Sequence, residues 1–413
     1  MTKQFLRPVR VAVLSLTLAA MMSPAFAESG APSTAQPAAS AHPSETDLAP
    51  AKLQYYWTRE MDLAGTERVA RMYVKDENLY FITNTNYLRA VDAAVGNPRW
   101  SVRVGNDDNR IFEPTHVSNM QLPERMGTID DIQETESLAD FDTFDAVLVN
   151  SMTNLLVVER KKGTVYRDVR FENLTAADAG VSDGTLFFVG TAEKNYCAVK
   201  LLPNVMIWKE HLGQIVSAPM AYYDGRLFMG TRDGLLRCAD ANNFGEKRWD
   251  RTFDGSITEK VHVDARGLFL ACNDHRIHGF NPYTGVELWP AVVVKGDVGG
   301  PMQMGEKTLF QYIADDGLYA VNVTNGEVRW KLPAGRAVLA ILDDVVYVLD
   351  AEKKLHLVNE ITGKETAVVP FAGFDFYALN TAAPAIYTAT RAGQVYCLRP
   401  TNAGRLTAEM LAK

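Results

Sequence analysis

Four tryptophans in the second half of the chain recur at an almost constant spacing. Trp208, Trp249, Trp289 and Trp330 are separated by 41, 40 and 41 residues. A fixed period of about 40 residues is typical of repeat proteins, in which each repeat is one supersecondary unit that packs on its neighbours. This spacing constrains the fold more than any other feature of the sequence.

The clearest repeat unit extends from Asp224 to Trp249. It contains two Asp-Gly pairs, at 224–225 and 233–234, and each stands between short apolar runs. Such pairs are the strongest short-range signal for a β-hairpin. A further turn at Gly245 precedes the segment that carries the tryptophan. The unit therefore predicts short antiparallel strands joined by tight turns.

The same pattern occurs about eight times from Leu53 onward, and most modules are separated by some 37 to 41 residues. Each module has an apolar strand, and these strands begin at Leu79, Val147, Leu186, Leu227, Leu268, Leu309, Val346 and Ile386. One four-stranded propeller blade takes about 40 residues. We therefore predict an all-β fold, an eight-bladed β-propeller of four-stranded antiparallel blades over residues 51–405.

The two ends of the repeat region complement each other. The last module, residues 386–399, has no tryptophan strand after Gly404, whereas the segment around Trp57 is a tryptophan strand without a preceding module. We expect residues 55–63 to complete the eighth blade and to close the ring, which leaves no open sheet edge.

Six tryptophans are predicted to dock each blade on the next. They are Trp57, Trp100, Trp208, Trp249, Trp289 and Trp330. The second and seventh blades have Tyr166-Arg167 and Thr366-Ala367 where the tryptophan is due. Since a large aromatic side chain buries roughly 150–250 Å², we expect these two junctions to be the softest.

The N-terminus has the pattern of an export signal. Lys3, Arg7 and Arg10 precede an apolar run at residues 11–22, and Ala25-Phe26-Ala27 follows it. This pattern predicts a signal peptide over residues 1–27, cleavage after Ala27, and a periplasmic or secreted protein. Residues 28–50 are rich in Ala, Pro and Ser and are expected to form a flexible spacer, and residues 406–413 a C-terminal tail.

Charge and cysteine content exclude several classes of protein. The net charge is −8, so the chain lacks the basic surface of a nucleic-acid-binding protein. No later apolar run approaches the roughly 20 residues of a transmembrane helix.

The first cysteine is Cys197, so we expect no lipid anchor at the new N-terminus. The four cysteines, which also include Cys238, Cys272 and Cys397, lack the spacing of a disulfide framework or a zinc site and are interpreted as small buried hydrophobes. Cys197, Cys238 and Cys397 are assigned to the third-strand position where other modules have alanine.

Two segments resemble a known motif. AVDAAVGNPRW at 90–100 and AVNVTNGEVRW at 320–330 resemble the tryptophan-docking motif of PQQ-like, quinoprotein-type β-propellers, over about residues 53–400. In size, repeat count and export the chain is similar to BamB-type outer-membrane assembly proteins. That resemblance implies a non-catalytic, monomeric scaffold in the cell envelope that binds protein partners on its surface. The chain departs from this family in lacking a cysteine for lipid attachment, and in having Gln214-Ile215-Val216 where the family has Leu-x-Leu-Arg.

The same family contains enzymes, which the resemblance implies would use an adjacent cysteine pair, a calcium ion and an aspartate base. No two cysteines are adjacent here, and no carboxylate cluster interrupts the repeat. We therefore expect no enzyme activity, no cofactor, and no catalytic, cofactor-binding or metal-binding residues. A PQQ- and calcium-dependent dehydrogenase is one alternative. Another is a small-ligand-binding sensor, which would gather polar and aromatic groups at the central channel.

Two further features are candidates for binding. His275 and His278 lie beside Asp274, but a pair three residues apart on a strand points to opposite faces, so we do not predict a metal site. An acidic insertion is predicted at residues 106–144, between the first and second blades. It is either a solvated loop or a partner-binding flap, for which the candidate residues are Asp130, Asp131, Glu134 and Glu136.

Overall fold

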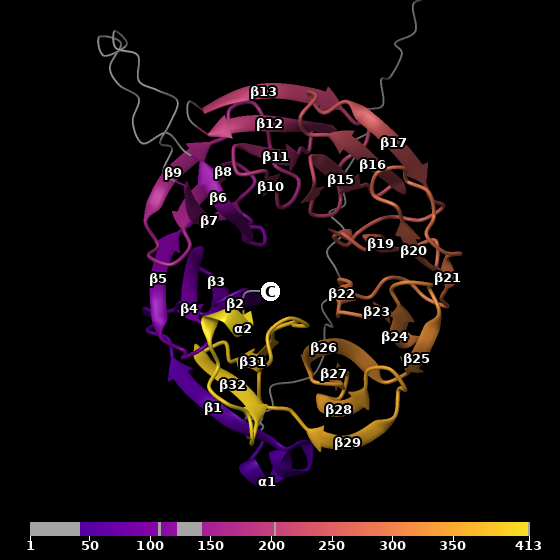
Figure 1. The fold of residues 1–413 in the computed structure, drawn as a ribbon. Coiled ribbons are helices and arrows are strands. Elements are labelled where there is room, and N and C mark those ends of the chain that lie inside the picture. Colours follow the sequence, from indigo (N-terminus) through magenta and orange to yellow (C-terminus); the bar gives the residue numbers. More distant parts are fainter. Residues whose placement is uncertain (1–41, 106–108, 122–142, 202–203, 412–413) are drawn as a thin grey trace, which may run out of the picture. The chain divides into compact units, whose positions relative to one another are not determined.

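The structure, a computed structural model, describes residues 42–105, 109–121, 143–201 and 204–411. In this part of the chain the strands form eight sheets of four antiparallel strands each. The sheets stand in a ring around a central opening (Figure 1). The predicted eight-bladed β-propeller is therefore confirmed. The predicted signal peptide lies outside the described residues.

The first four blades are built in chain order, from the centre of the ring outward (Figure 1). Blade 1 consists of β2 (Val69–Lys75), β3 (Asn78–Thr83), β4 (Tyr87–Asp92) and β5 (Pro98–Arg103). Blade 2 consists of β6 (Thr115–Gln121), β7 (Thr143–Asn150), β8 (Asn154–Glu159) and β9 (Val165–Arg170). Blade 3 consists of β10 (Val181–Ser182), β11 (Leu186–Gly190), β12 (Asn195–Leu201) and β13 (Asn204–His211). Blade 4 consists of β14 (Ala221–Tyr223), β15 (Arg226–Gly230), β16 (Leu235–Asp240) and β17 (Lys247–Thr252).

The second half of the ring repeats this order. Blade 5 consists of β18 (His262–Asp264), β19 (Gly267–Cys272), β20 (Arg276–Phe280) and β21 (Val292–Val293). Blade 6 consists of β22 (Gln303–Met304), β23 (Thr308–Ile313), β24 (Gly317–Asn322) and β25 (Val328–Leu332). Blade 7 consists of β26 (Gly335–Leu342), β27 (Val345–Asp350), β28 (Lys354–Asn359) and β29 (Glu365–Pro370). Blade 8 consists of β30 (Phe376–Tyr377), β31 (Ile386–Ala389), β32 (Gln394–Pro400) and β1 (Leu53–Glu60).

The ring is closed by the two ends of the repeat region. Strand β1 pairs antiparallel with β32, so that Trp57 lies opposite Cys397 and Glu60 opposite Gln394. The first strand of the propeller thus forms the outer edge of its last blade, as predicted from the sequence.

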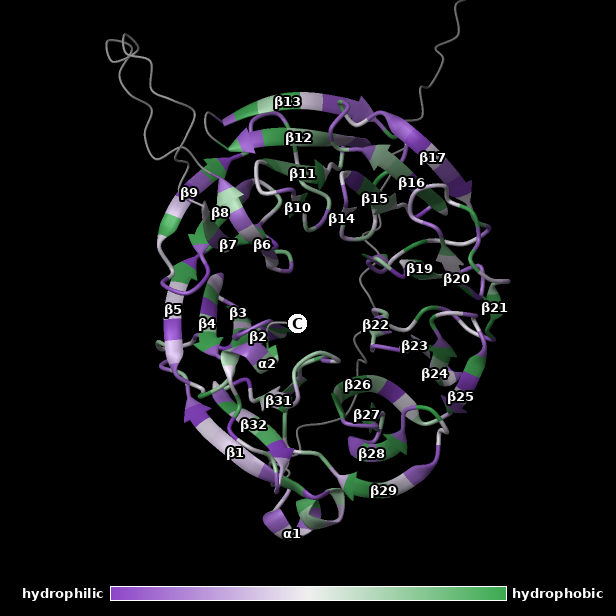
Figure 2. Cartoon of the chain, viewed as in Figure 1, coloured by the Kyte–Doolittle hydropathy of each residue, from purple (hydrophilic) through white to green (hydrophobic). Residues whose placement is uncertain are grey.

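The core lies between neighbouring blades. All six residues of β3 are buried, because each blade is covered on both faces by its neighbours. The outer strands are different. Figure 2 shows hydrophilic residues over much of β17, where every residue is exposed or half-buried. The apolar strands named in the sequence are therefore the second strands of the blades.

Each of the six tryptophans lies against a turn glycine of the following blade. A Cβ added at Gly96 would lie 2.6 Å from Cε3 of Trp57, and the glycine has a φ of +75°. Both the close approach and the positive φ require glycine. The pairs are Trp57/Gly96, Trp100/Gly163, Trp208/Gly245, Trp249/Gly285, Trp289/Gly326 and Trp330/Gly363. Five of these tryptophans lie on an outer strand, whereas Trp289 precedes the short strand β21.

The indole N–H groups are not all bonded in the same way. Trp330 donates to the carbonyl oxygen of Glu360 at 2.7 Å, in the next blade. The Trp57 Nε1 atom is buried without a hydrogen-bond partner among the described residues. Tyr387 instead donates to the Ala93 carbonyl at 3.1 Å. The Trp57 indole therefore contributes packing without a hydrogen bond, whereas the Trp330 indole contributes both.

Residues 42–51 differ from the prediction of a flexible spacer that extends to residue 50. They form helix α1 (Glu45–Leu48), capped by Ser44, and the 3-10 turn η1 (Ala49–Ala51). Leu48 is fully buried and packs in a cluster with Phe371 and Phe374 of the blade 7–8 connection. This short segment is stabilised by its capping box and by the burial of the Leu48 side chain against blade 7.

The predicted C-terminal tail is also part of the propeller. It contains α2 (Ala408–Leu411), and Leu406 and Leu411 are buried in a cluster with Trp57. Among the described residues no helix is long and apolar enough to cross a membrane, since α1 and α2 have four residues each.

The acidic insertion is placed differently from the prediction. Residues 115–121 are β6, the first strand of blade 2, and Ile111 and Phe112 are buried. Residues 109–121 therefore belong to blade 2, and the segment outside the described residues, 122–142, follows its first strand.

The assignment of Cys197 also needs correction. Ala198, not Cys197, lies opposite Trp208, whereas Cys238 lies opposite Trp249 as expected.

Candidate functional site in the central channel

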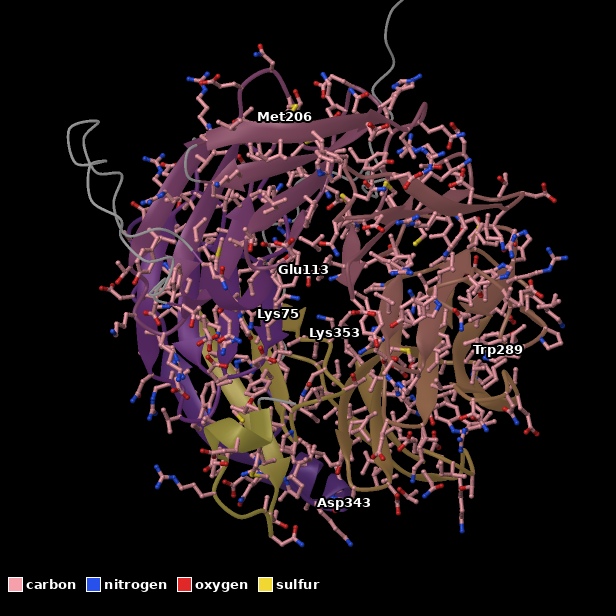
Figure 3. The ribbon with its side chains drawn as sticks, turned by 45° about the horizontal axis from the view of Figure 1, so that its top comes forward. Lys75, Glu113, Met206, Trp289, Asp343 and Lys353 are labelled. Atoms are coloured by element: carbon pink, nitrogen blue, oxygen red, sulfur yellow. The ribbon has the colours of Figure 1, made fainter. Side chains whose placement is uncertain are left out.

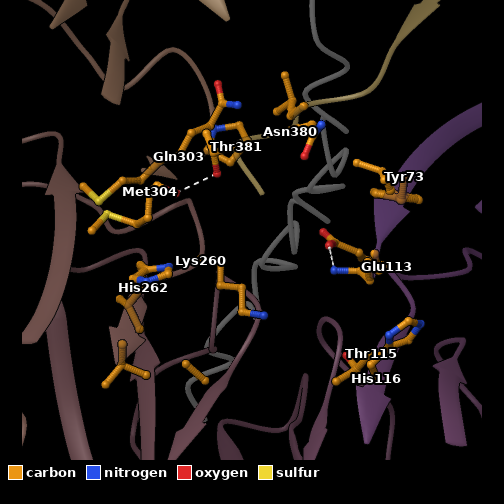
Figure 4. A pocket seen from close by; sticks show the side chains of 18 of the residues that line it. Tyr73, Glu113, Thr115, His116, Lys260, His262, Gln303, Met304, Asn380 and Thr381 are labelled. Atoms are coloured by element: carbon orange, nitrogen blue, oxygen red, sulfur yellow. Dashed lines mark hydrogen bonds and ion pairs between the residues drawn. The ribbon is translucent and has the colours of Figure 1, made fainter. Parts of the chain in front are cut away.

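A cavity of about 660 Å³ occupies the centre of the ring. It is lined by residues of the first strands, or of the segments next to them, from seven blades. Its wall combines polar and aromatic groups with methionines, and Figure 4 shows their side chains around the open centre. Side chains far apart in the sequence, from Met72 to Thr381, meet here because the ring brings all first strands to one axis.

One ion pair crosses the wall between blades 1 and 2. Lys75 Nζ lies 2.5 Å from Glu113 Oε1, and the two side chains are 23% and 37% exposed. Burial by itself would raise the pKa of Glu113, but the Lys75 ammonium outweighs it and the pKa is lowered. Figure 3 shows both residues at the edge of the central opening. The charge of Lys75 is thus compensated within the protein.

Lys260, just before β18 in blade 5, has no such compensation. Its side chain extends into the open centre of the cavity (Figure 4) and has no hydrogen bond or ion pair among the described residues. The residue is exposed to solvent in the channel, yet blades surround it on all sides. This enclosure, together with the nearby Lys75 ammonium, lowers the pKa of Lys260, while the Glu113 carboxylate acts in the opposite direction.

Other polar side chains of the wall are bonded to the protein. Gln303 donates to the Val338 carbonyl at 2.7 Å and accepts from the Val338 N–H at 2.9 Å. Thr381 donates to the Met304 carbonyl at 2.6 Å (Figure 4). Asn380 donates to the carbonyls of Ala383 and Ala385. These groups hold the loops of blades 6 and 8 in place.

The histidines of the wall are likewise bonded. His116 Nδ1 lies 2.7 Å from Asp76 Oδ2, and its Nε2 lies 2.7 Å from the Tyr80 hydroxyl. Although burial favours a higher pKa for Asp76, His116 and Arg160 lower it. On the other side of the cavity, His262 Nε2 lies 3.0 Å from Asp264 Oδ2. Both histidines therefore have structural partners.

The candidate partner-binding residues predicted from sequence stay a prediction, because the described residues do not include them. Asp130, Asp131, Glu134 and Glu136 lie outside the described residues. His278 is buried beside Asp274 at 2.9 Å, whereas His275 lies in an exposed turn with a φ of +61°. No group of three potential metal-binding side chains occurs in the described part of the chain.

The four cysteines are free and buried. Burial raises the pKa of the Cys197, Cys238 and Cys272 thiols to about 12, and it also raises that of Cys397. Because the thiolate is the reactive form, none of these thiols is activated near neutral pH.

Sequence reasoning missed Lys75, Glu113 and Lys260. The three residues lie 4, 34 and 8 positions before the apolar strands that begin at Leu79, Val147 and Leu268. They therefore occupy no common position in the repeat, and only a charged residue beside a predicted inner strand could have indicated them.

The family and the fold can be compared with known proteins. Residues 232–402 match the family model described as outer membrane protein assembly factor BamB. The match includes β16 and β17 of blade 4, blades 5 to 7, and three strands of blade 8. No curated protein matches the chain significantly.

Two solved structures are similar in fold. BamB from Moraxella catarrhalis has a TM-score of 0.60 and 14% sequence identity, over 85% of this chain and 99% of that one. The computationally designed Ika8 protein has a TM-score of 0.60 and 11% identity, over 82% of this chain and 98% of that one. The repeats and the ring make the chain an eight-bladed β-propeller. Within that class, residues 232–402 are similar to the BamB family, and the whole propeller is similar in fold to a BamB structure.

Proposed function

We propose that this chain is an exported, non-catalytic scaffold that binds protein partners in the cell envelope and takes part in outer-membrane protein assembly. The observation that carries the proposal is the match of residues 232–402 to the family model of outer membrane protein assembly factor BamB. The fold similarity to BamB from Moraxella catarrhalis over 85% of the chain supports it.

The chemistry of the described residues supports a non-catalytic role. An enzyme of the quinoprotein type would need reactive groups near a cofactor. The four cysteines are instead free and buried in the hydrophobic core, and burial raises their pKa values. Reconstitution with PQQ and calcium, followed by a dye-reduction assay with alcohols and sugars, tests the enzymatic alternative. We expect no dye reduction.

Exposed apolar side chains on the turns between third and fourth strands are suited to a protein partner. Phe244 in blade 4 is 67% exposed, Val286 in blade 5 is 58% exposed and Ile361 in blade 7 is 43% exposed. We call these three residues the apolar turn row. The three residues occupy the same turn in three different blades, and we propose that a protein partner binds across these turns.

Affinity capture from an envelope fraction, followed by mass spectrometry, tests the scaffold function. We expect the wild-type chain to enrich outer-membrane assembly proteins. A variant with Phe244→Asp and Ile361→Asp should lose most of this enrichment. The control is Val293→Asp, since Val293 is 70% exposed on the outer edge of blade 5. A designed propeller of unrelated sequence serves as a second bait. If the wild type and this designed propeller enrich the same envelope proteins to the same extent, the proposal is wrong.

A further inference from the structure

The central cavity has the size of a small-molecule site. Its volume is about 660 Å³. Ligand pockets are usually clefts of about 300–1,000 Å³ with a mainly apolar wall and a few polar groups that fix the ligand. A central channel is general to β-propellers, so the chemistry of this wall, and not the presence of a cavity, decides what it can bind.

Lys260 distinguishes this cavity from a space filled only by water. The other lysine of the wall, Lys75, is paired with Glu113 at 2.5 Å. Lys260 extends into the same space without a hydrogen bond or ion pair among the described residues (Figure 4). Because Lys260 is exposed to solvent in the channel, its ammonium is accessible to an anion that enters the cavity. The surrounding blades and the Lys75 ammonium lower its pKa, and a bound anion would act in the opposite direction.

The rest of the wall limits what this anion can be. Gln303, Asn380 and Thr381 are already bonded to backbone groups and offer little to a polar ligand. Met302, Met304 and Leu379 supply apolar surface on the same wall. Methionine side chains are flexible and adapt to differently shaped apolar groups. The arrangement suits a ligand with one anionic group and an apolar body.

Nearby acids do not cancel the charge of Lys260. Lys75 neutralises Glu113. Burial raises the pKa values of Glu259 and Asp178, and neither residue lines the cavity. With Lys75 and Glu113 paired, the remaining formal charge among the lysine and carboxylate side chains of the described wall is the one on Lys260.

We infer that the central channel binds a small organic carboxylate, whose anionic group pairs with Lys260 and whose apolar body lies against Met302 and Met304. A lysine ammonium presents three donors on a flexible stem, so it can pair with a carboxylate in several orientations. This site is independent of the proposed scaffold function.

Calorimetric titration of the full chain with 3-phenylpropionate tests the inference, and 3-phenylpropanamide serves as the neutral analogue. We expect the carboxylate to bind, and the amide to bind roughly tenfold to a hundredfold more weakly, as for loss of a charged hydrogen bond. Lys260→Gln should weaken carboxylate binding by the same factor, and Lys260→Arg should largely preserve it. The control is Lys161→Gln, which changes an exposed lysine in the turn between β8 and β9.

Three results would overturn the inference. They are no binding of the carboxylate by folded wild-type protein at about 10 mM, equal affinity for the amide, and unchanged affinity in Lys260→Gln. Thermal melting shows whether each variant folds. If Lys260→Gln does not fold, the comparison of carboxylate with amide on the wild type and on Lys260→Arg still decides the question.

Discussion

Trp208 of blade 3 lies directly on Gly245 of blade 4. A Cβ added to Gly245 would lie 2.6 Å from Cζ3 of the indole, and the glycine has a φ of +73°. The same relationship recurs at five other junctions. Each tryptophan thus requires a glycine one repeat later, which explains why both residues follow the same period.

Replacement of this glycine tests the contact. Gly245→Ala introduces both a clash and an unfavourable φ, and we expect it to lower the free energy of unfolding by about 2–5 kcal/mol. Gly213→Ala is the matched control, because Gly213 has a φ of +83° and no atom within 4 Å of an added Cβ. Gly213→Ala introduces the unfavourable φ without a clash, so we expect it to lower the free energy of unfolding by about 1–2 kcal/mol. Urea unfolding measures both changes, and equal losses would show that the indole contact is unimportant.

The two kinds of tryptophan predict different responses to phenylalanine. Trp330→Phe removes a hydrogen bond of 2.7 Å to the Glu360 carbonyl. Trp57→Phe removes none, since Trp57 Nε1 has no partner among the described residues. Both changes remove similar apolar area. We expect Trp330→Phe to be more destabilising by about 1–2 kcal/mol, the cost of leaving a buried polar group unpaired. A larger loss for Trp57→Phe in urea unfolding would contradict this account.

How much could be predicted from sequence depended on whether a feature is local or periodic. The blades and the ring closure could be predicted from the turn pairs and from the spacing of the tryptophans, because these signals recur in most repeats. The packing of Leu48 could not be predicted, because a four-residue helix has no periodicity and is stabilised by Phe371 and Phe374, more than 300 residues later. The assignment of Cys197 was wrong by one residue, and a shift of one residue moves a side chain to the opposite face of a strand.

The channel site could not be predicted for a related reason. Lys75, Glu113 and Lys260 come from blades 1, 2 and 5 and share no position in the repeat. They meet only because the ring places the first strands around one axis. Which residue of a short inner strand points to that axis depends on the register of each blade.

His356 predicts a pH dependence of stability. It is buried in blade 7, with Nδ1 2.7 Å from Glu365 Oε2 and Nε2 3.0 Å from Asp350 Oδ2. Burial alone would lower the pKa of His356, but the two carboxylates raise it above the usual value. Because the folded-state pKa is the higher one, the resulting stability is fully present below the unfolded-state pKa of about 6.5 and is lost as pH rises through the folded-state pKa.

Comparison of His356→Gln with the wild type tests this sign. We expect the wild type to have a higher free energy of unfolding in urea than the variant. This difference should be largest at about pH 5.5 and smaller at about pH 8.5. Glu365→Gln should reduce the pH dependence, because it removes one of the two carboxylates. Glu352→Gln is the control, since Glu352 is exposed and pairs with Lys354. A gain that grows toward high pH would contradict the raised pKa.

The segment before the first strand provides the last prediction. Leu48 is fully buried against blade 7 and the connection to blade 8, at a junction where Ala367 occupies the place of a docking tryptophan. We expect Leu48→Ala to destabilise the protein by about 2–5 kcal/mol, as for other buried leucines. The control is Glu45→Ala, which changes an exposed residue of the same short helix and should cost less than about 0.5 kcal/mol. A flexible spacer would give no loss for either variant, so equal stability of the two in urea unfolding would show that α1 does not contribute to the blade 7–8 junction.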